Sequence, residues 1–203
     1  MDPLLLIVSI AILIMSVVLH ELSHGYTAEL LGDPTPRLQG RLTINPVRHL
    51  ELFGSVIVPI LTSLLGFTFG WAKPVQWNPY NVKNRRVGEF LISLAGPMSN
   101  ILIAVIFGFI IRFAPEIASP SFLAISKYIV AINITLAIFN LIPIPPLDGS
   151  KILFSLLPPN LIHIRGAFEH YSLFLVLILI FFLWDFIAPV IPFLFWVITG
   201  TNL

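Results

Sequence analysis

LLLIVSIAILIMSVVLHELSH, residues 4–24, is the stretch from which the architecture of this chain follows. Its first part, residues 4–19, is apolar, and a helix needs about 20 such residues to cross the hydrocarbon core of a bilayer. The helical pattern continues to Leu31 and ends at Gly32-Asp33-Pro34, because glycine and proline both stop helices. The sequence therefore predicts a membrane helix that carries two histidines and a glutamate near its far end.

The composition of the whole chain also indicates a protein that is surrounded by lipid. Of its 203 residues, 57% are hydrophobic and only 10% are charged, whereas about a quarter are charged in an ordinary soluble domain. The net charge of +1 gives no electrostatic basis for binding nucleic acid. The absence of cysteine excludes disulfides, thiol nucleophiles and cysteine-ligated zinc together. The lipid bilayer is therefore an expected partner, and nucleic acid is not.

Further apolar segments predict an all-α polytopic membrane protein with about five or six hydrophobic segments. Pro59 and Gly66 interrupt one of them, so that segment is expected to re-enter the membrane or form a hairpin, packed against protein. Short alternation near residues 37–46 predicts a strand or a β-hairpin. The chain is expected to form one membrane-embedded domain, 1–203, with a catalytic core at about 4–155. Beyond residues 4–31, the apolar segments are 53–70, 90–111, 122–142 and the C-terminal hydrophobic segment, about 171–199.

Basic residues in two loops predict the orientation in the membrane. Loops rich in lysine and arginine favour the cytoplasmic side. If residues 53–70 re-enter, both basic loops lie on that side, and so do His20–His24 and the proline-rich turn 143–149. We therefore expect a multi-pass cell-membrane protein with its active site towards the cytoplasm. The basic residues of the two loops are Arg37, Arg41 and Arg48, and Lys73, Lys83, Arg85 and Arg86.

His20-Glu21-Leu22-Ser23-His24 matches the pattern H-E-x-x-H. On a helix, positions i and i+4 share a face, so both imidazoles can bind one metal ion, with Glu21 placed to take a proton from water. Polar residues at a membrane helix end are costly and by default functional. The alternative is a helix end at the interface whose histidines and glutamate are merely solvated.

Asp148 is the favoured third ligand, because catalytic zinc uses three protein ligands. It follows a proline-broken helix on the predicted side of His20, whereas the remaining histidines and most glutamates fall in polar loops. The longer metzincin pattern does not match, because it requires a third histidine at position 30, which is leucine in this chain. An Asp-Gly turn without metal remains the alternative for Asp148.

Asparagines in apolar helices have two interpretations, a bond to a neighbouring helix or a role at the site. For Asn100 we favour the interhelical bond. Asn140 lies eight residues before Asp148 and is a candidate for binding substrate or an oxyanion. The stretch 41–45 can pair as a strand edge with an extended peptide, which makes Asn45 a further candidate substrate contact. Lys127, Asn133 and Asp185 are interpreted as interfacial or interhelical features.

These motifs resemble the site-2 protease family of intramembrane zinc metalloproteases, over residues 10–155. The likeness rests on H-E-x-x-H and on the segment from Asn140 to Gly149, NLIPIPPLDG. The compact branch without a PDZ or CBS domain is resembled by three further segments. They are GRLTINP at 40–46, WAKPV at 71–75 and LAGPMSN at 94–100.

The resemblance implies that His20, His24 and Asp148 bind one zinc ion and that Glu21 is the general base. It also implies transmembrane proteins as substrates. The chain departs from better-known members in having no separate span before the H-E-x-x-H helix, and its C-terminal quarter carries no assigned motif. The alternatives are a metal-binding membrane transporter and a protease of another family with a glutamate as third ligand.

Overall fold

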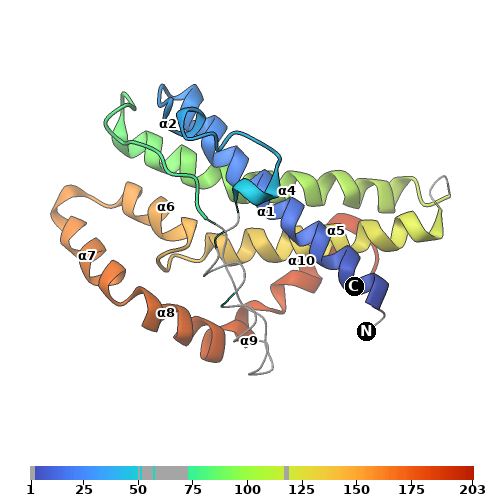
Figure 1. Ribbon diagram of the computed structural model, residues 1–203. Coiled ribbons are helices and arrows are strands. Elements are labelled where there is room, and N and C mark those ends of the chain that lie inside the picture. Colours follow the sequence, from blue (N-terminus) through green and yellow to red (C-terminus); the bar gives the residue numbers. More distant parts are fainter. Residues whose placement is uncertain (1–2, 50, 52–56, 58–72, 117–118) are drawn as a thin grey trace.

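Three long helices form the centre of the molecule. The structure, a computed structural model, describes residues 3–49, 51, 57, 73–116 and 119–203. Within these residues, three helices are long and apolar enough to cross a membrane. Helix α4 packs against the other two (Figure 1). The three are α1 (Pro3–Leu30), α4 (Arg85–Phe113) and α5 (Pro120–Leu141).

N-cap residues determine where α4 and α5 begin. The Asn84 side chain accepts a hydrogen bond from the Val87 amide, and Ser119 caps α5 in the same way, with Pro120 in its first turn. Between the helices, the rings of Phe107 and Phe122 lie 6.5 Å apart. Asn100, which precedes Phe107 in α4, contacts Asn133, which follows Phe122 in α5, so α4 and α5 are antiparallel.

An apolar cluster joins α4 and α5 to the end of the chain. Ala104, Val130 and Phe195 are fully buried in it. Phe195 belongs to α10 (Val190–Thr199), which packs against both long helices. A Cβ at Gly108 would collide with Ile198, so the small residue allows α10 to approach α4 closely.

The chain after α5, including the C-terminal hydrophobic segment, is divided into short helices. A bend of 67° separates His163–His170 from Ser172–Ile187, so this part adds at most one more candidate span. The expected count of five or six hydrophobic segments is therefore not confirmed. The helices are α6 (Asp148–Leu156), η3 (Pro159–Leu161), α7 (Ile162–His170), α8 (Ser172–Ile178), the π-helical η4 (Leu179–Leu183) and α9 (Trp184–Ile187).

The strand or hairpin expected near residues 37–46 is absent from the described chain. Arg37 and Leu38 instead end the short helix α2 (Thr35–Leu38), which Pro36 helps to start. Turns and bends follow as far as η1 (Pro46–Arg48). The alternation Arg41–Ile44 is short, and without a partner strand its backbone turns instead of extending. The re-entrant interpretation of 53–70 falls almost wholly outside the described residues.

Asp33 connects the end of α1 to the loop before α4. Its carboxylate accepts hydrogen bonds from the amides of Thr35 and Asn78, from the Thr35 hydroxyl and from the Asn81 side chain. Burial acts to raise the pKa of Asp33, but these hydrogen bonds, that of the Thr35 hydroxyl first, hold it below its ordinary value. The loop is thereby held against the end of α1.

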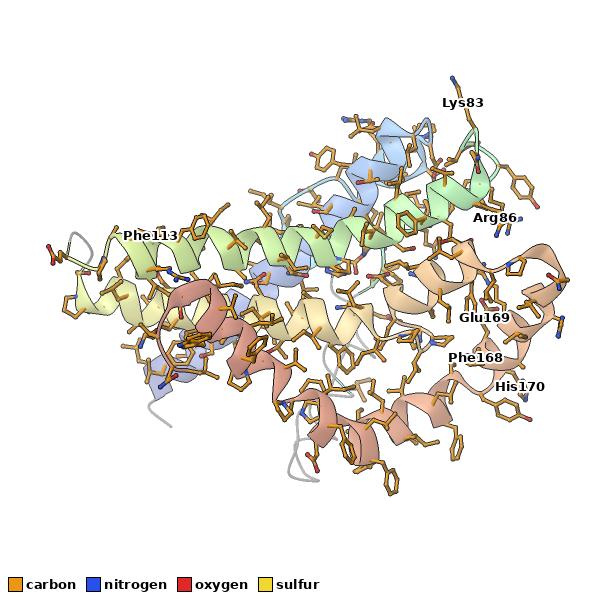
Figure 2. All side chains as sticks on the ribbon, turned by 180° about the vertical axis from the view of Figure 1, so that it is seen from behind. Lys83, Arg86, Phe113, Phe168, Glu169 and His170 are labelled. Carbon is orange, nitrogen blue, oxygen red and sulfur yellow. The ribbon has the colours of Figure 1, made fainter. Side chains whose placement is uncertain are left out.

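Charged residues gather at one end of the helical core. Lys83 and Arg86 lie at the same end as Glu169 and His170, with Phe113 at the opposite end of α4 (Figure 2). Arg165 of α7 forms an ion pair of 2.7 Å with the nearly buried Glu89 of α4. This pair and the Arg86 guanidinium, which donates to the Ser155 carbonyl, attach α6 and α7 to the start of α4.

Replacing Asp33 with asparagine should lower stability because an amide has one acceptor oxygen for four donors. At pH 7 we expect a loss of about 2 to 4 kcal/mol. A depressed carboxyl pKa contributes stability that is present above the unfolded pKa, about 3.9, and is lost below it. The gap between wild type and Asp33→Asn should therefore stay constant from pH 8 to 5 and narrow below pH about 4. Denaturation in detergent measures it, and a gap that already closes near pH 6 would contradict the assignment.

Candidate metal centre

Two imidazoles and one carboxylate meet inside the helical core. His20 and His24 lie one turn apart on α1, and their Nε2 atoms are 3.0 Å from each other. Asp148, in the first turn of α6, places its Oδ2 atom 3.0 Å from both. All three residues are buried, with 5 to 8% of their surface exposed. The predicted trio therefore converges on one point, although 124 residues separate His24 from Asp148.

The outward nitrogens of both imidazoles are engaged with oxygen atoms. Nδ1 of His20 lies 2.6 Å from Oδ1 of Asn100, and Nδ1 of His24 lies 2.6 Å from the Ile92 carbonyl oxygen. A carbonyl can only accept, so Nδ1 carries the hydrogen in each ring. The Nε2 lone pairs are then free to face the shared point.

The donor set fits one zinc ion. Two neutral imidazoles and a carboxylate are three protein ligands of the kind that catalytic zinc uses. With bonds of about 2.0 to 2.1 Å, tetrahedral ligand atoms lie roughly 3.3 Å apart. The separations of 3.0 Å come close to this value. In the described part of the chain, this is the one cluster of histidine and acidic side chains that can hold a metal.

The proline-rich turn delivers Asp148 to the histidines. Leu147, in extended conformation, precedes α6, and Asp148 opens that helix. A Cβ at the next residue, Gly149, would fall on the backbone carbonyl of Leu141 at the end of α5. Only glycine therefore allows α6 to start so close to α5. Oδ1 of Asp148 accepts from Nζ of Lys151, which leaves Oδ2 for the shared point.

Gly96 makes room for the imidazoles on α4. A Cβ built on Gly96 would come within 3.0 Å of Nε2 of both His20 and His24, closer than real Cβ atoms come to other atoms. The rings cannot retreat without breaking the Nδ1 contacts that orient them. Helix α4 thus serves as the floor of the metal centre.

Glu21 lies beside the histidines and is half-buried. Its Oε2 accepts a hydrogen bond of 2.8 Å from the Val75 amide. Val75 belongs to the loop that Asp33 holds through Asn78. A backbone donor therefore orients the carboxylate without neutralising it.

The two candidate substrate contacts make local hydrogen bonds. The Asn140 amide donates to the Leu136 carbonyl of its own helix, and Asn140 is half-buried. Asn45 is exposed, and its side chain accepts from the Val47 amide at the start of η1. Within the described chain, neither residue forms a hydrogen bond with the buried trio. Their roles towards substrate stay predictions.

Sequence reasoning missed several groups that support the centre. Asn100, which the sequence predicts to be an interhelical residue, also contacts His20 directly. The Ile92 carbonyl and the Val75 amide are backbone groups, which no side-chain pattern reveals. Gly96 stands in an otherwise apolar helical run, where a glycine can signal close approach. Lys151 follows Asp148 by one helical turn, and this spacing was the available signal for their ion pair.

Known proteins are similar to this chain over most of its length. YwhC of Bacillus subtilis, whose name describes a candidate zinc metalloprotease, is 34% identical over 191 residues, which cover 91% of this chain and 82% of that protein. The Peptidase family M50 model matches residues 114–183, which include Asp148. The chain belongs to the site-2 protease family, peptidase family M50. It is thus a zinc metalloprotease of the site-2 type, and its apolar helices make it a membrane protein.

Two mycobacterial relatives of this M50 peptidase carry a similar name, candidate zinc metalloprotease Rip2. The Mycolicibacterium smegmatis protein is 29% identical over 82% of this chain, and the Mycobacterium tuberculosis H37Rv protein is 28% identical over 87%. The matches span 64% and 65% of those proteins. No solved structure matches the chain. The expected enzyme class and the expected zinc ion are confirmed.

Substituting alanine for Gly96 should abolish zinc binding by this M50 peptidase. The added methyl group occupies the space of both Nε2 atoms, so the rings must turn away from the shared point. Gly166→Ala is the matched control, since Gly166 is also helical and has nothing within 4 Å of a built Cβ. Zinc content of purified protein, by atomic absorption, should fall below about a tenth of wild type in Gly96→Ala only. Full zinc content in that variant would contradict the geometry.

Proposed function

We propose that this protein hydrolyses peptide bonds of transmembrane protein substrates within the bilayer, near its cytoplasmic face. The depth of the buried trio carries this proposal. His20 lies 13 residues after Ile7, where the candidate membrane span begins, which is roughly 20 Å along the helix. The hydrocarbon core is about 30 Å thick. A metal site at this depth meets a peptide bond that lies inside the membrane or at its edge.

The proposed zinc ligands are Nε2 of His20, Nε2 of His24 and Oδ2 of Asp148. When bound, zinc supplies a Lewis acid that polarises the scissile carbonyl and makes water more acidic. The chain contributes the orientation of these ligands, through Asn100, the Ile92 carbonyl and Lys151. Burial of the trio limits the approach of bulk water, so that only the reacting water needs to enter.

Glu21 is the proposed general base. Its carboxylate takes a proton from the attacking water as the water oxygen bonds to the peptide carbonyl carbon. When the carbon–nitrogen bond breaks, the same carboxyl group returns that proton to the leaving amine. The Val75 amide keeps the carboxylate in place during both transfers. Asn140 is proposed to contact the substrate or its oxyanion, and Asn45 to contact the substrate.

An apolar groove of about 650 Å³ supports a transmembrane segment as substrate. It lies beside the turn of α1 that holds the histidines, and α4 and the segment 42–44 complete it. Such an apolar wall suits the aliphatic side chains of a membrane segment. The groove is lined by Leu19, Leu22, Ser23, Tyr26, Leu42, Thr43, Ile44, Ser99, Leu102 and Ile103.

The proposed orientation rests on charge. Arg37, Arg41 and Arg48 follow α1, and Lys83, Arg85 and Arg86 precede or open α4. The two helices meet at this end, because His24 of α1 contacts the Ile92 carbonyl of α4. Basic loops favour the cytoplasmic side, so we place this end and the metal centre there.

Substituting glutamine for Glu21 should abolish cleavage and leave zinc in place. Glutamine preserves the acceptor for the Val75 amide but cannot take a proton at neutral pH. We expect cleavage of a model transmembrane substrate in detergent to fall about 10²- to 10⁴-fold. Asp148→Ala should lose zinc as well as activity, whereas Glu29→Gln, elsewhere on α1, should leave both near wild type. Cleavage by Glu21→Gln at more than a tenth of the wild-type rate would refute the assigned base.

A tryptophan at Leu102 should obstruct the groove without disturbing the metal. Leu102 is 60% exposed on α4 and lines the groove. Phe109 lies two turns further along the same helix, is 55% exposed and is not among the lining residues, so Phe109→Trp is the matched control. The rate of substrate cleavage should drop about tenfold or more in Leu102→Trp, the equivalent of about 1.4 kcal/mol. Equal rates in the two variants would show that the substrate does not use this groove.

A further inference from the structure

A line of buried polar side chains runs from the metal centre into the interior of the membrane helices. Asn100 on α4 accepts from His20 and donates to Oδ1 of Asn133 on α5, at 2.8 Å. Asn133 in turn donates to the Ser16 hydroxyl on α1, at 2.9 Å. The line therefore leaves α1 at His20, crosses two other helices and returns to α1 one turn earlier.

This line is sealed from solvent and has one direction. Asn100 and Asn133 are completely buried, and Ser16 is 4% exposed. Each amide oxygen accepts from the residue nearer the metal, and each amide nitrogen donates away from it. Asn100 also donates to the Ser16 carbonyl at 3.4 Å, and Asn133 to the Ile129 carbonyl at 2.9 Å. Turning either amide over would set donor against donor or acceptor against acceptor.

The two histidines are oriented by different kinds of group. His24 uses the Ile92 carbonyl, which the backbone of α4 already holds rigidly. His20 uses a side chain, and an asparagine side chain can rotate unless something restrains it. Asn133 and Ser16 supply that restraint for Asn100. Packing between helices alone would not require the line to end on a ring nitrogen.

We propose that Asn133 and Ser16 are positioning residues for zinc binding, acting on His20 through Asn100. This inference rests on the proposed assignment of His20 as a zinc ligand. Outer hydrogen-bond partners of metal-binding histidines typically change metal affinity by 10- to 100-fold. Asn133 on α5 contacts neither a proposed ligand nor the groove. Its effect on zinc affinity therefore has to act through Asn100 on His20 of α1.

The test is the zinc dissociation constant of the full-length protein in detergent, by competition with a chromogenic chelator. Asn133→Leu, of similar volume, should raise the constant about tenfold. Ser16→Ala should raise it about threefold, as expected for one neutral hydrogen bond. Thr135→Val is the matched control, because the Thr135 hydroxyl donates only to the Ala131 carbonyl of its own helix. It should bind zinc as wild type does.

Asn100 is the direct contact between this line and His20. Asn100→Leu removes the acceptor for His20 and should weaken zinc binding about tenfold or more. If these polar groups served packing alone, Asn100→Leu would lower the thermal midpoint and leave the zinc dissociation constant unchanged.

Zinc dissociation constants within a factor of two of wild type in folded Asn133→Leu and Ser16→Ala would overturn the proposal. If Asn133→Leu does not fold, Ser16→Ala decides, since it removes a single hydroxyl group. Zinc binding is measured without substrate, so failure of this proposal is separable from failure of the proposed proteolysis. Wild-type protein that binds zinc but cleaves no substrate, together with the expected loss of zinc affinity in the variants, would contradict only the proposed proteolysis.

Discussion

The structure depends on bringing three polar atoms, the proposed metal ligands, together where the surroundings are apolar. Nε2 of two histidines and Oδ2 of Asp148 lie 3.0 Å from one another inside helices that face lipid or one another. An unpaired polar group in such a place costs several kcal/mol. Each remaining polar atom of these side chains therefore needs its own partner, and the neighbouring helices supply it. The arrangement of α1, α4 and α6 follows from this requirement.

Each element has a separate task around the centre. Helix α1 carries two of the proposed ligands and the proposed base on consecutive turns, and α6 carries the proposed third ligand immediately after a proline-rich turn. Helix α4 approaches so closely that Gly96 can have no side chain, and it also supplies the oxygens that orient both rings. Helix α10 and the ionic contacts of Arg165 stabilise α4 away from the centre. Helix α4 thus contacts the proposed metal site through some residues and the stabilising contacts of α10 and Arg165 through others.

The loop before α4 connects the polar end of the molecule to Glu21, the proposed base. Asp33 holds this loop through Asn78 and Asn81, and the loop in turn places the Val75 amide on Glu21. An acid with its pKa held below the ordinary value stays ionised at neutral pH and keeps these donors. The exposed end of the protein therefore contributes to the orientation of a carboxylate beside the buried trio.

Much of the site was predictable from short-range patterns. H-E-x-x-H and the turn that carries Asp148 are each formed by consecutive residues, and a helix places positions i and i+4 on the same face. The long apolar runs likewise predicted the three principal helices. The prediction of a hairpin near residues 37–46 was wrong, because alternation over a few residues does not form a strand unless another strand pairs with it. Asn100 and Asn133 were recognisable as buried polar residues, but the atoms they contact lie 80 and 117 residues away in the chain. Only the tertiary structure decided that one of these asparagines contacts His20, that Gly96 faces both rings and that the Val75 amide reaches Glu21. Such contacts depend on the rotation and spacing of whole helices and loops, and no local pattern of residues determines them.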